Sequence, residues 1–255
     1  MVDWGQLTLF IYVTARMSGF VLFNPILGRS TIPGTVRAGF VLVFSISVMS
    51  FVGQEVAVPS GLLLMAVQIM LEMALGFLLG MVMNFFFYIP QLAGEVIDNQ
   101  MGLAMNQIYD PASQANMSVT GVLLNTLMIL LFFAANGHHT LLRIMLTSGE
   151  IVPYGAVSFG NNVAGAMLEL FVECTIFAVK LAMPILAAEL VGQVGMGVLM
   201  KLIPQINVFV INIDLKVLIG LGLLLLLISP FSEYLLKIER TMLDSLENIL
   251  KLTAA

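Results

Sequence analysis

The sequence predicts an all-α integral membrane protein. Hydrophobic residues make up 60% of its 255 residues and charged residues only 10%, whereas a soluble domain is about 45–50% apolar and about 25% charged. The mean hydropathy is +1.04, so the chain has too few polar side chains to cover a water-facing globule. No alternation of apolar and polar residues repeats at strand length, which argues against an outer-membrane barrel.

Six apolar segments carry the helical prediction. A single membrane crossing needs about 20 residues, yet two of the six are clearly shorter, and two are longer than one straight crossing. We therefore expect about six interrupted, hairpin-like helical segments rather than a bundle of equal spans. Gly76 and Gly80 form a small-xxx-small pair that permits close helix approach. The segments cover residues 7–27, 38–52, 62–89, 119–135, 163–191 and 215–228.

Segment 229–255 has a different pattern. Apolar residues recur there at helical spacing while charged residues occupy other faces, and Ser229 with Pro230 supplies a cap and a first-turn proline. The segment is predicted to be an amphipathic helix that lies on a partner protein or at the membrane surface. Its mixed charges favour the partner.

Several classes of function are disfavoured by what the sequence lacks. The net charge is −5 and no run of Lys or Arg occurs, so nucleic acid is not an expected partner. No nucleotide-binding, metalloprotease, nucleophile-elbow or CxxC motif is present. The adjacent His138 and His139 would point about 100° apart on a helix and make a poor metal pair. We expect no enzyme activity, catalytic residue, cofactor or metal site, so any energy source must be external.

Charged residues inside the apolar segments are the first candidates for a functional role. A central Asp, Lys or Arg costs about 2.5–3.5 kcal/mol on the insertion scale, so each such residue is expected to face protein rather than lipid. Together they form a predicted buried charge network. Its members are Arg16, Glu72, Glu169, Glu173, Lys180 and Glu189.

Three interpretations of the charges in the fifth segment stay open. Glu169, Glu173 and Lys180 fall within a narrow helical stripe, whereas Glu189 lies on the opposite side, beyond a predicted kink at Pro184. The first interpretation is a buried Glu173–Lys180 ion pair inside a helix assembly. The others are a proton or ion relay and a contact with another protein.

The polar connection at 90–120 is a candidate site. A structureless loop of this length is uncommon unless it is functional. The connection is rich in Met, Gln and Asn and carries no Lys or Arg. Met101 and Met105 are gate-lining candidates, because flexible Met side chains at a constriction give a soft seal around varied passing chains.

Specific motifs run in order along nearly the whole chain. They are Arg16-Met17-Ser18-Gly19, Asn24-Pro25, Pro33-Gly34-Thr35-Val36-Arg37, Asp98-Asn99-Gln100-Met101-Gly102-Leu103-Ala104, Asn136-Gly137-His138-His139 and, after 184–189, Pro204-Gln205-Ile206-Asn207-Val208-Phe209. Together these residues resemble the FliR family of flagellar export-gate proteins, which is known in virulence secretion systems as the SctT family.

The resemblance implies a fold, partners and a location. The chain, as one domain over 1–255, would be one subunit of a helical hetero-oligomeric gate with several FliP and FliQ subunits. They would form a closed conduit at the flagellar basal body in the bacterial inner membrane. FlhB would wrap the cytoplasmic entrance, and unfolded flagellar proteins would be the exported substrates, with membrane lipid around the assembly. Interrupted and charged segments are tolerable in such an assembly, since they face neighbouring subunits.

By the same resemblance, the loop after Met105 contributes to the central plug of the conduit and falls on 107–120. Small and polar residues, a proline and the absence of cations suit a movable obstruction in a wet pore. The residues expected to form the plug are Asn106, Gln107, Ile108, Tyr109, Asp110, Pro111, Ala112, Ser113, Gln114, Ala115, Asn116 and Met117.

The chief alternative function is a secondary transporter or proton-coupled permease. Gly- and Pro-interrupted segments and intramembrane carboxylates are marks of that class too. Against it, the chain shows no pair of matching halves, and six uneven segments are few for a self-sufficient transporter. A third interpretation is a non-conducting membrane scaffold whose Met- and Gln-rich loop only packs.

Overall fold

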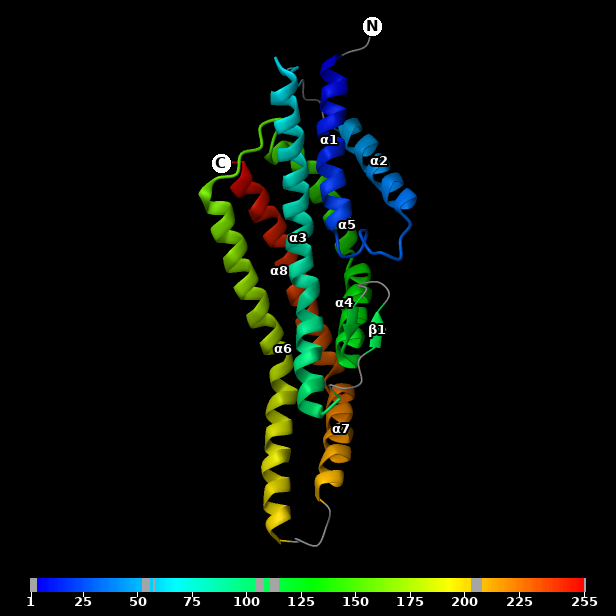
Figure 1. The fold of residues 1–255 in the computed structure, drawn as a ribbon, viewed down its shortest axis with the longest axis vertical. Helices are drawn as coiled ribbons and strands as arrows, with labels where there is room; N and C mark the ends of the chain where they lie inside the picture. Colours follow the sequence, from blue (N-terminus) through cyan, green and yellow to red (C-terminus); the bar gives the residue numbers. More distant parts are fainter. Residues whose placement is uncertain are drawn as a thin grey trace. The chain divides into compact units, whose positions relative to one another are not determined.

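Eight α-helices and one short β-hairpin make up the residues that the computed structural model describes, which are 4–51, 56, 58–103, 108–110, 115–202 and 208–254 (Figure 1). The prediction of an all-α fold is confirmed. The elements are α1 (Trp4–Phe23), α2 (Gly34–Phe51), α3 (Leu62–Met101), β1 (Ile108–Asp110), β2 (Ala115–Met117), α4 (Val119–Ala134), α5 (Gly137–Ile151), α6 (Asn161–Leu202), α7 (Val208–Leu226) and α8 (Ile228–Thr253).

The helices suit a membrane by length and composition. Four of the described helices, α1, α2, α3 and most of α6, are long and apolar enough to cross one. Two further pairs, α4 with α5 and α7 with α8, bring the number to six if each sharply bent pair counts as one span. The expectation of about six uneven, interrupted segments is therefore in line with the structure.

The chain divides into two compact units. The first unit comprises Met1–Phe86, Asn136–Phe171 and Glu239–Ala255. The second comprises Phe87–Ala135 and Val172–Ile238. Three helices, α3, α6 and α8, therefore contribute residues to both units.

In the first unit, α1 and α3 approach each other through glycines. A Cβ atom added to Gly19 would lie 2.2 Å from the carbonyl oxygen of Met73, and one added to Gly76 would lie 2.0 Å from that of Arg16. No side chain fits at such distances, so these positions require glycine. A Cβ atom added to Gly80 would lie 2.9 Å from Phe23 at the end of α1. The predicted small-xxx-small contact is confirmed, and its partner is α1.

In the second unit, α3 and α4 cross closely just outside the hairpin. A Cβ atom on Gly94 would lie 2.1 Å from the backbone nitrogen of Gly121. The rings of Phe87 and Phe132 meet edge to face with centroids 6.1 Å apart, and both side chains are buried. Helices α3 and α4 therefore pack through both a close backbone contact at Gly94 and an aromatic contact between Phe87 and Phe132.

Three element boundaries differ from the sequence prediction. Helix α3 continues through Pro90 to Met101, so the first third of the predicted 90–120 loop is helical; membrane helices tolerate proline where the freed carbonyl finds another partner. Helix α6 continues to Leu202 through a glycine-rich stretch, past residue 191 at which the fifth predicted segment ends. Helix α5 was not among the six segments, because His, Thr, Arg, Ser and Gly dilute its apolar residues.

Helix α8 carries apolar and charged residues on different faces, and its apolar face does not lie where the sequence led us to expect. The residues of its apolar face are buried within this chain. Of its charged residues, Glu233, Lys237 and Asp244 are exposed, whereas Glu239 is buried. The apolar face therefore packs on the chain itself rather than on a partner or the membrane surface. Its members are Phe231, Leu235, Ile238, Met242, Leu246 and Ile249.

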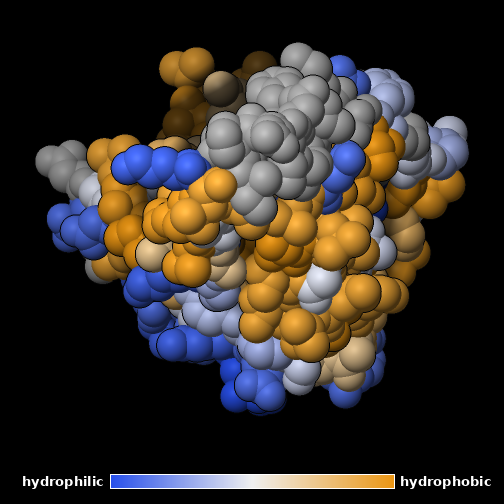
Figure 2. All heavy atoms as spheres, turned by 90° about the horizontal axis from the view of Figure 1, so that it is seen from below, coloured by the Kyte–Doolittle hydropathy of each residue, from blue (hydrophilic) through white to orange (hydrophobic). Residues whose placement is uncertain are grey.

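Apolar surface remains on the outside of the chain. Phe51, Leu62, Leu202 and Leu226 are each more than two-thirds exposed. Figure 2 shows apolar side chains over much of one face, with hydrophilic residues gathered along its lower edge. Contiguous apolar surface of this kind marks contact with membrane or protein.

Candidate functional site: the hairpin between α3 and α4

The segment between α3 and α4 contains a small antiparallel hairpin. Strand β1 pairs with β2 so that Ile108 lies opposite Met117 and Tyr109 opposite Asn116. The side chains of Ile108 and Tyr109 are 47% and 61% exposed, whereas that of Met117 is buried. The hairpin therefore presents apolar and aromatic groups outward and is anchored by its second strand.

The base of the hairpin is fixed by Asp98 on the last turns of α3. Its carboxylate accepts a hydrogen bond from the backbone N–H of Thr120 at 3.2 Å and a second from the Thr120 hydroxyl. Both side chains are almost fully buried. An anionic acceptor at the first turn of α4 satisfies a free backbone donor and interacts favourably with the helix dipole.

Two further features close the base. The Ser118 hydroxyl accepts a hydrogen bond from Gly121 N–H at 3.0 Å, which caps α4. At the end of α3, Gly102 has φ +82°, and Leu103 N–H donates to the Asp98 carbonyl at 2.8 Å. Glycine at this left-handed position ends the helix. The chain thus leaves α3 and enters α4 at defined points.

Met101 does not line an open surface of this chain. Its side chain is fully buried and lies over Gly220 of α7, where an added Cβ atom would be 2.6 Å from Met101 Cε. The gate-lining expectation for Met101 is therefore corrected, because the glycine on α7 leaves room that this side chain fills. Met105 lies outside the described residues.

The predicted plug residues are only partly described. Ile108, Tyr109, Asn116 and Met117 belong to the hairpin, and the backbones of Asp110 and Ala115 pair at its outer end. The sequence predicted a polar loop here and missed the two short strands. Six of the named residues lie outside the described part of the chain, namely Asn106, Gln107, Pro111, Ala112, Ser113 and Gln114.

The charge in α1 finds its partner within the first unit. Arg16 Nε donates to Glu72 Oε2 at 2.7 Å, and both side chains are fully buried. The guanidinium also donates to the Val152 carbonyl at 3.0 Å and lies 4.1 Å from the centre of the Tyr154 ring. The other Glu72 oxygen accepts from Gly155 N–H at 2.7 Å. This cluster joins α1, α3 and the segment after α5.

The predicted Glu173–Lys180 pair is wrong within this chain. Both side chains are exposed, and neither has an ion-pair partner among the described residues. The two residues are seven positions apart, which is about 10.5 Å along a helix axis. Glu169 is also exposed. By contrast, Glu189 is 1% exposed, and its Oε1 has no hydrogen-bond partner in the described chain.

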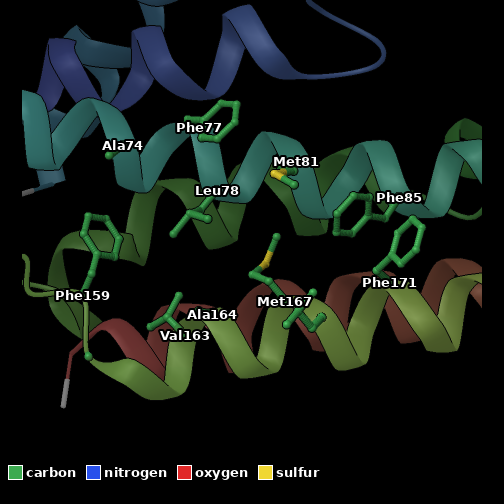
Figure 3. Close-up of a pocket in the computed structure, with 12 residues that line it drawn as sticks. Ala74, Phe77, Leu78, Met81, Phe85, Phe159, Val163, Ala164, Met167 and Phe171 are labelled. Carbon is green, nitrogen blue, oxygen red and sulfur yellow. The ribbon is translucent and has the colours of Figure 1, made fainter.

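A groove in the first unit lies between α3 and α6 (Figure 3). It has a volume of about 940 Å³ and is lined by twelve residues that are all apolar or glycine. Figure 3 shows Leu78 and Phe85 of α3 directed toward α6, and Met167 and Phe171 of α6 directed toward α3. With no titratable group in its lining, the groove suits apolar groups rather than catalysis.

Metal-ligating side chains do not cluster in the part of the chain that the structure describes. No group of three or more His, Cys, Asp and Glu residues is placed there to hold a metal ion. The rings of His138 and His139 are in contact at the start of α5, with centroids 4.1 Å apart and planes tilted by 44°.

The sequence reasoning missed Asp98 and Thr120 as a pair. Asp98 was noted only as part of a motif, and Thr120 only as the end of an expected plug. The available signal was that Asp98 follows Gly94 by one helical turn, so both face the same neighbour. That signal becomes informative only once α3 is known to extend past Pro90.

Comparison with known proteins gives a consistent result. The sequence pattern of the family described as bacterial export proteins, family 1, matches residues 7–242. The chain is 31% identical over 211 residues to flagellar biosynthetic protein FliR of Escherichia coli (strain K12), covering 82% of this chain and 80% of that protein. The corresponding protein of Bacillus subtilis (strain 168) is 25% identical over 217 residues, covering 82% and 81%.

A virulence-system protein is similar over the same extent. Yop proteins translocation protein T of Yersinia pestis is 27% identical over 221 residues, covering 85% of this chain and 84% of that protein. The similarity therefore extends to relatives named for flagellar biosynthesis and to relatives named for protein translocation.

Proposed function

The chain belongs to the bacterial export proteins, family 1, the FliR and SctT family, and from that premise we propose that it helps to form the closable conduit of a type III export gate. The chain is an integral inner-membrane component of flagellar or type III protein export. In the proposed gate it assembles with FliP and FliQ subunits, FlhB lies at the cytoplasmic entrance, and unfolded flagellar subunits pass through. The chain acts there as a passage and not as an enzyme.

The observation that carries the proposal is the fixed base of the α3–α4 hairpin. Asp98, Thr120 and Ser118 hold the two ends of the hairpin segment, while Ile108 and Tyr109 are exposed on it. A segment that is fixed at its two ends and carries exposed side chains between them can move as a unit without unfolding its neighbours. Those are the properties needed in an obstruction that blocks a pore at rest and yields to a passing chain.

The experiment removes the obstruction and keeps its base. Deleting residues 106–116 leaves Asp98, Ser118 and Thr120 in place. The complex is expected to assemble at normal level, and cells carrying it are expected to become permeable to ions. Membrane conductance and co-purification of the neighbouring subunits are measured together.

A matched control tests whether the size of the deleted segment or its particular sequence blocks the pore. Residues 106–116 are replaced by a polar linker of equal length, which should restore part of the block if the segment acts as an obstruction. Unchanged conductance with the deletion in a fully assembled complex contradicts the plug and favours the non-conducting scaffold.

The base can be tested by a smaller change. Thr120→Val removes the hydroxyl that donates to Asp98 and keeps the side-chain shape, at a cost of about 1.5–3 kcal/mol for a hydrogen bond to a charged group. The variant is expected to assemble and to leak less than the deletion. Thr120→Ser retains the donor and serves as the control. Equal conductance of the two variants would mean that the Asp98 contact does not hold the hairpin.

A further inference from the structure

Between residues 172 and 187, helix α6 has one buried and one exposed face. At about 100° per residue the two faces lie on opposite sides of the helix. The buried residues are Cys174, Ala178, Leu181, Ala182 and Ile185. Five of the exposed residues lie along one line of the helix surface, hereafter the α6 stripe, and they are Glu173, Ile176, Lys180, Met183 and Ala187.

The α6 stripe places charge in a membrane-spanning segment. The candidate span within α6 is Asn162–Leu199. Because these are 38 residues and one crossing needs about 20, every 20-residue window inside the span includes Lys180. Lys180 and Glu173 lack an ion-pair partner among the described residues. Hydrocarbon is therefore an unfavourable environment for this face.

The spacing and signs of the two charges on the α6 stripe indicate whether a lipid headgroup or a protein helix would stabilise them better. The two charges have opposite sign and lie about 10.5 Å apart along the axis, with apolar Ile176 between them and Met183 one turn beyond. An anionic lipid headgroup would satisfy Lys180 and repel Glu173. A neighbouring helix can stabilise both charges. Its side chains recur along one face with the same rise per residue, so it can place a basic group beside Glu173 and an acidic group beside Lys180.

We infer that the α6 stripe is the docking surface for a membrane helix of another chain, which places a basic side chain opposite Glu173 and an acidic one opposite Lys180. The two partner charges lie about two helical turns apart, and small or apolar side chains pack on Ile176 between them. The inference rests on the proposed assembly into a hetero-oligomer and is independent of the plug.

Photocrosslinking tests the contact directly. A photoreactive amino acid replaces Ile176, and the complex is irradiated in native membranes after co-expression with its genomic neighbours. We expect a crosslink to another membrane polypeptide. The inference is overturned if the complex assembles and Ile176 crosslinks only to lipid or to nothing. If the unmodified chain forms no complex at all, the proposed function fails instead.

Charge variants test the chemistry. Lys180→Met should leave the partner's acidic group unpaired in the interface and lower the recovered complex by about tenfold or more. Glu173→Gln should also lower it. The control Lys201→Met removes an exposed lysine of the same helix outside the candidate span and should have no effect. Equal recovery of the Lys180 and Lys201 variants overturns the inference.

Discussion

Helices α3 and α6 are similar in length and differ in where their charged side chains lie. They contain 40 and 42 residues, and each contains one internal proline. Glu72 of α3 is fully buried and bonded to Arg16 at 2.7 Å. Glu173 and Lys180 of α6 are exposed. The charged residue Glu72 of α3 therefore bonds within this chain, whereas the charged residues Glu173 and Lys180 of α6 remain available to other chains.

The largest effect is expected from breaking the buried pair. Arg16→Met leaves the Glu72 carboxylate buried without its counter-charge and should destabilise the chain by about 3–5 kcal/mol. The amount of folded chain in membranes and its thermal stability in detergent are the measurements. The double variant Arg16→Met with Glu72→Met should recover most of the loss, because an apolar pair of similar volume is often neutral. No recovery would mean that the other bonds of the cluster dominate.

A smaller effect is expected from closing the glycine contact of α3. Gly76→Ala places a methyl group 2.0 Å from the Arg16 carbonyl oxygen and should cost about 1–3 kcal/mol by overpacking. Gly165→Ala on α6 is the matched control, because an added Cβ atom there meets nothing within 4 Å. It should leave the chain as stable or slightly more stable. Equal losses at both positions would contradict the close α1–α3 crossing.

The smallest effect on the chain itself is expected at the α6 stripe. Lys180→Met removes an exposed charge that has no ion-pair partner in the described chain, so the free energy of unfolding should change by no more than about 0.5 kcal/mol. Thermal unfolding of the purified variant in detergent measures this. A loss as large as that of Arg16→Met would show that Lys180 is structural, which would remove the contrast between α3 and α6.

Most helices were predictable because apolar composition is a local signal. The first, third and fourth segments begin or end within a few residues of α1, α3 and α4. Helix α5 was missed because polar and small residues such as His139 and Gly149 conceal an apolar face that includes Leu141 and Ile144. The polar end of α3 was taken for a loop because the apolar run ends at residue 89 and a polar stretch that starts with Pro90 follows it.

The pairings were not predictable, because they depend on tertiary proximity. Arg16 and Glu72 were each expected to need a protein partner, yet nothing in a separation of 56 residues indicates that they meet. Glu173 and Lys180 share a helical stripe, and that periodicity suggested a pair that their separation along the axis prevents. Patterns along one helix indicate which residues share a face, whereas the partner of that face is decided by the neighbouring element.

The central claim is that this chain works as one component of a hetero-oligomeric export gate. The most direct test is the native mass and composition of the complex extracted in detergent after co-expression with its genomic neighbours. We predict one copy of this chain in a large complex with several copies each of two smaller membrane proteins. A monomer or small homo-oligomer that is stable alone would contradict the claim and favour a transporter.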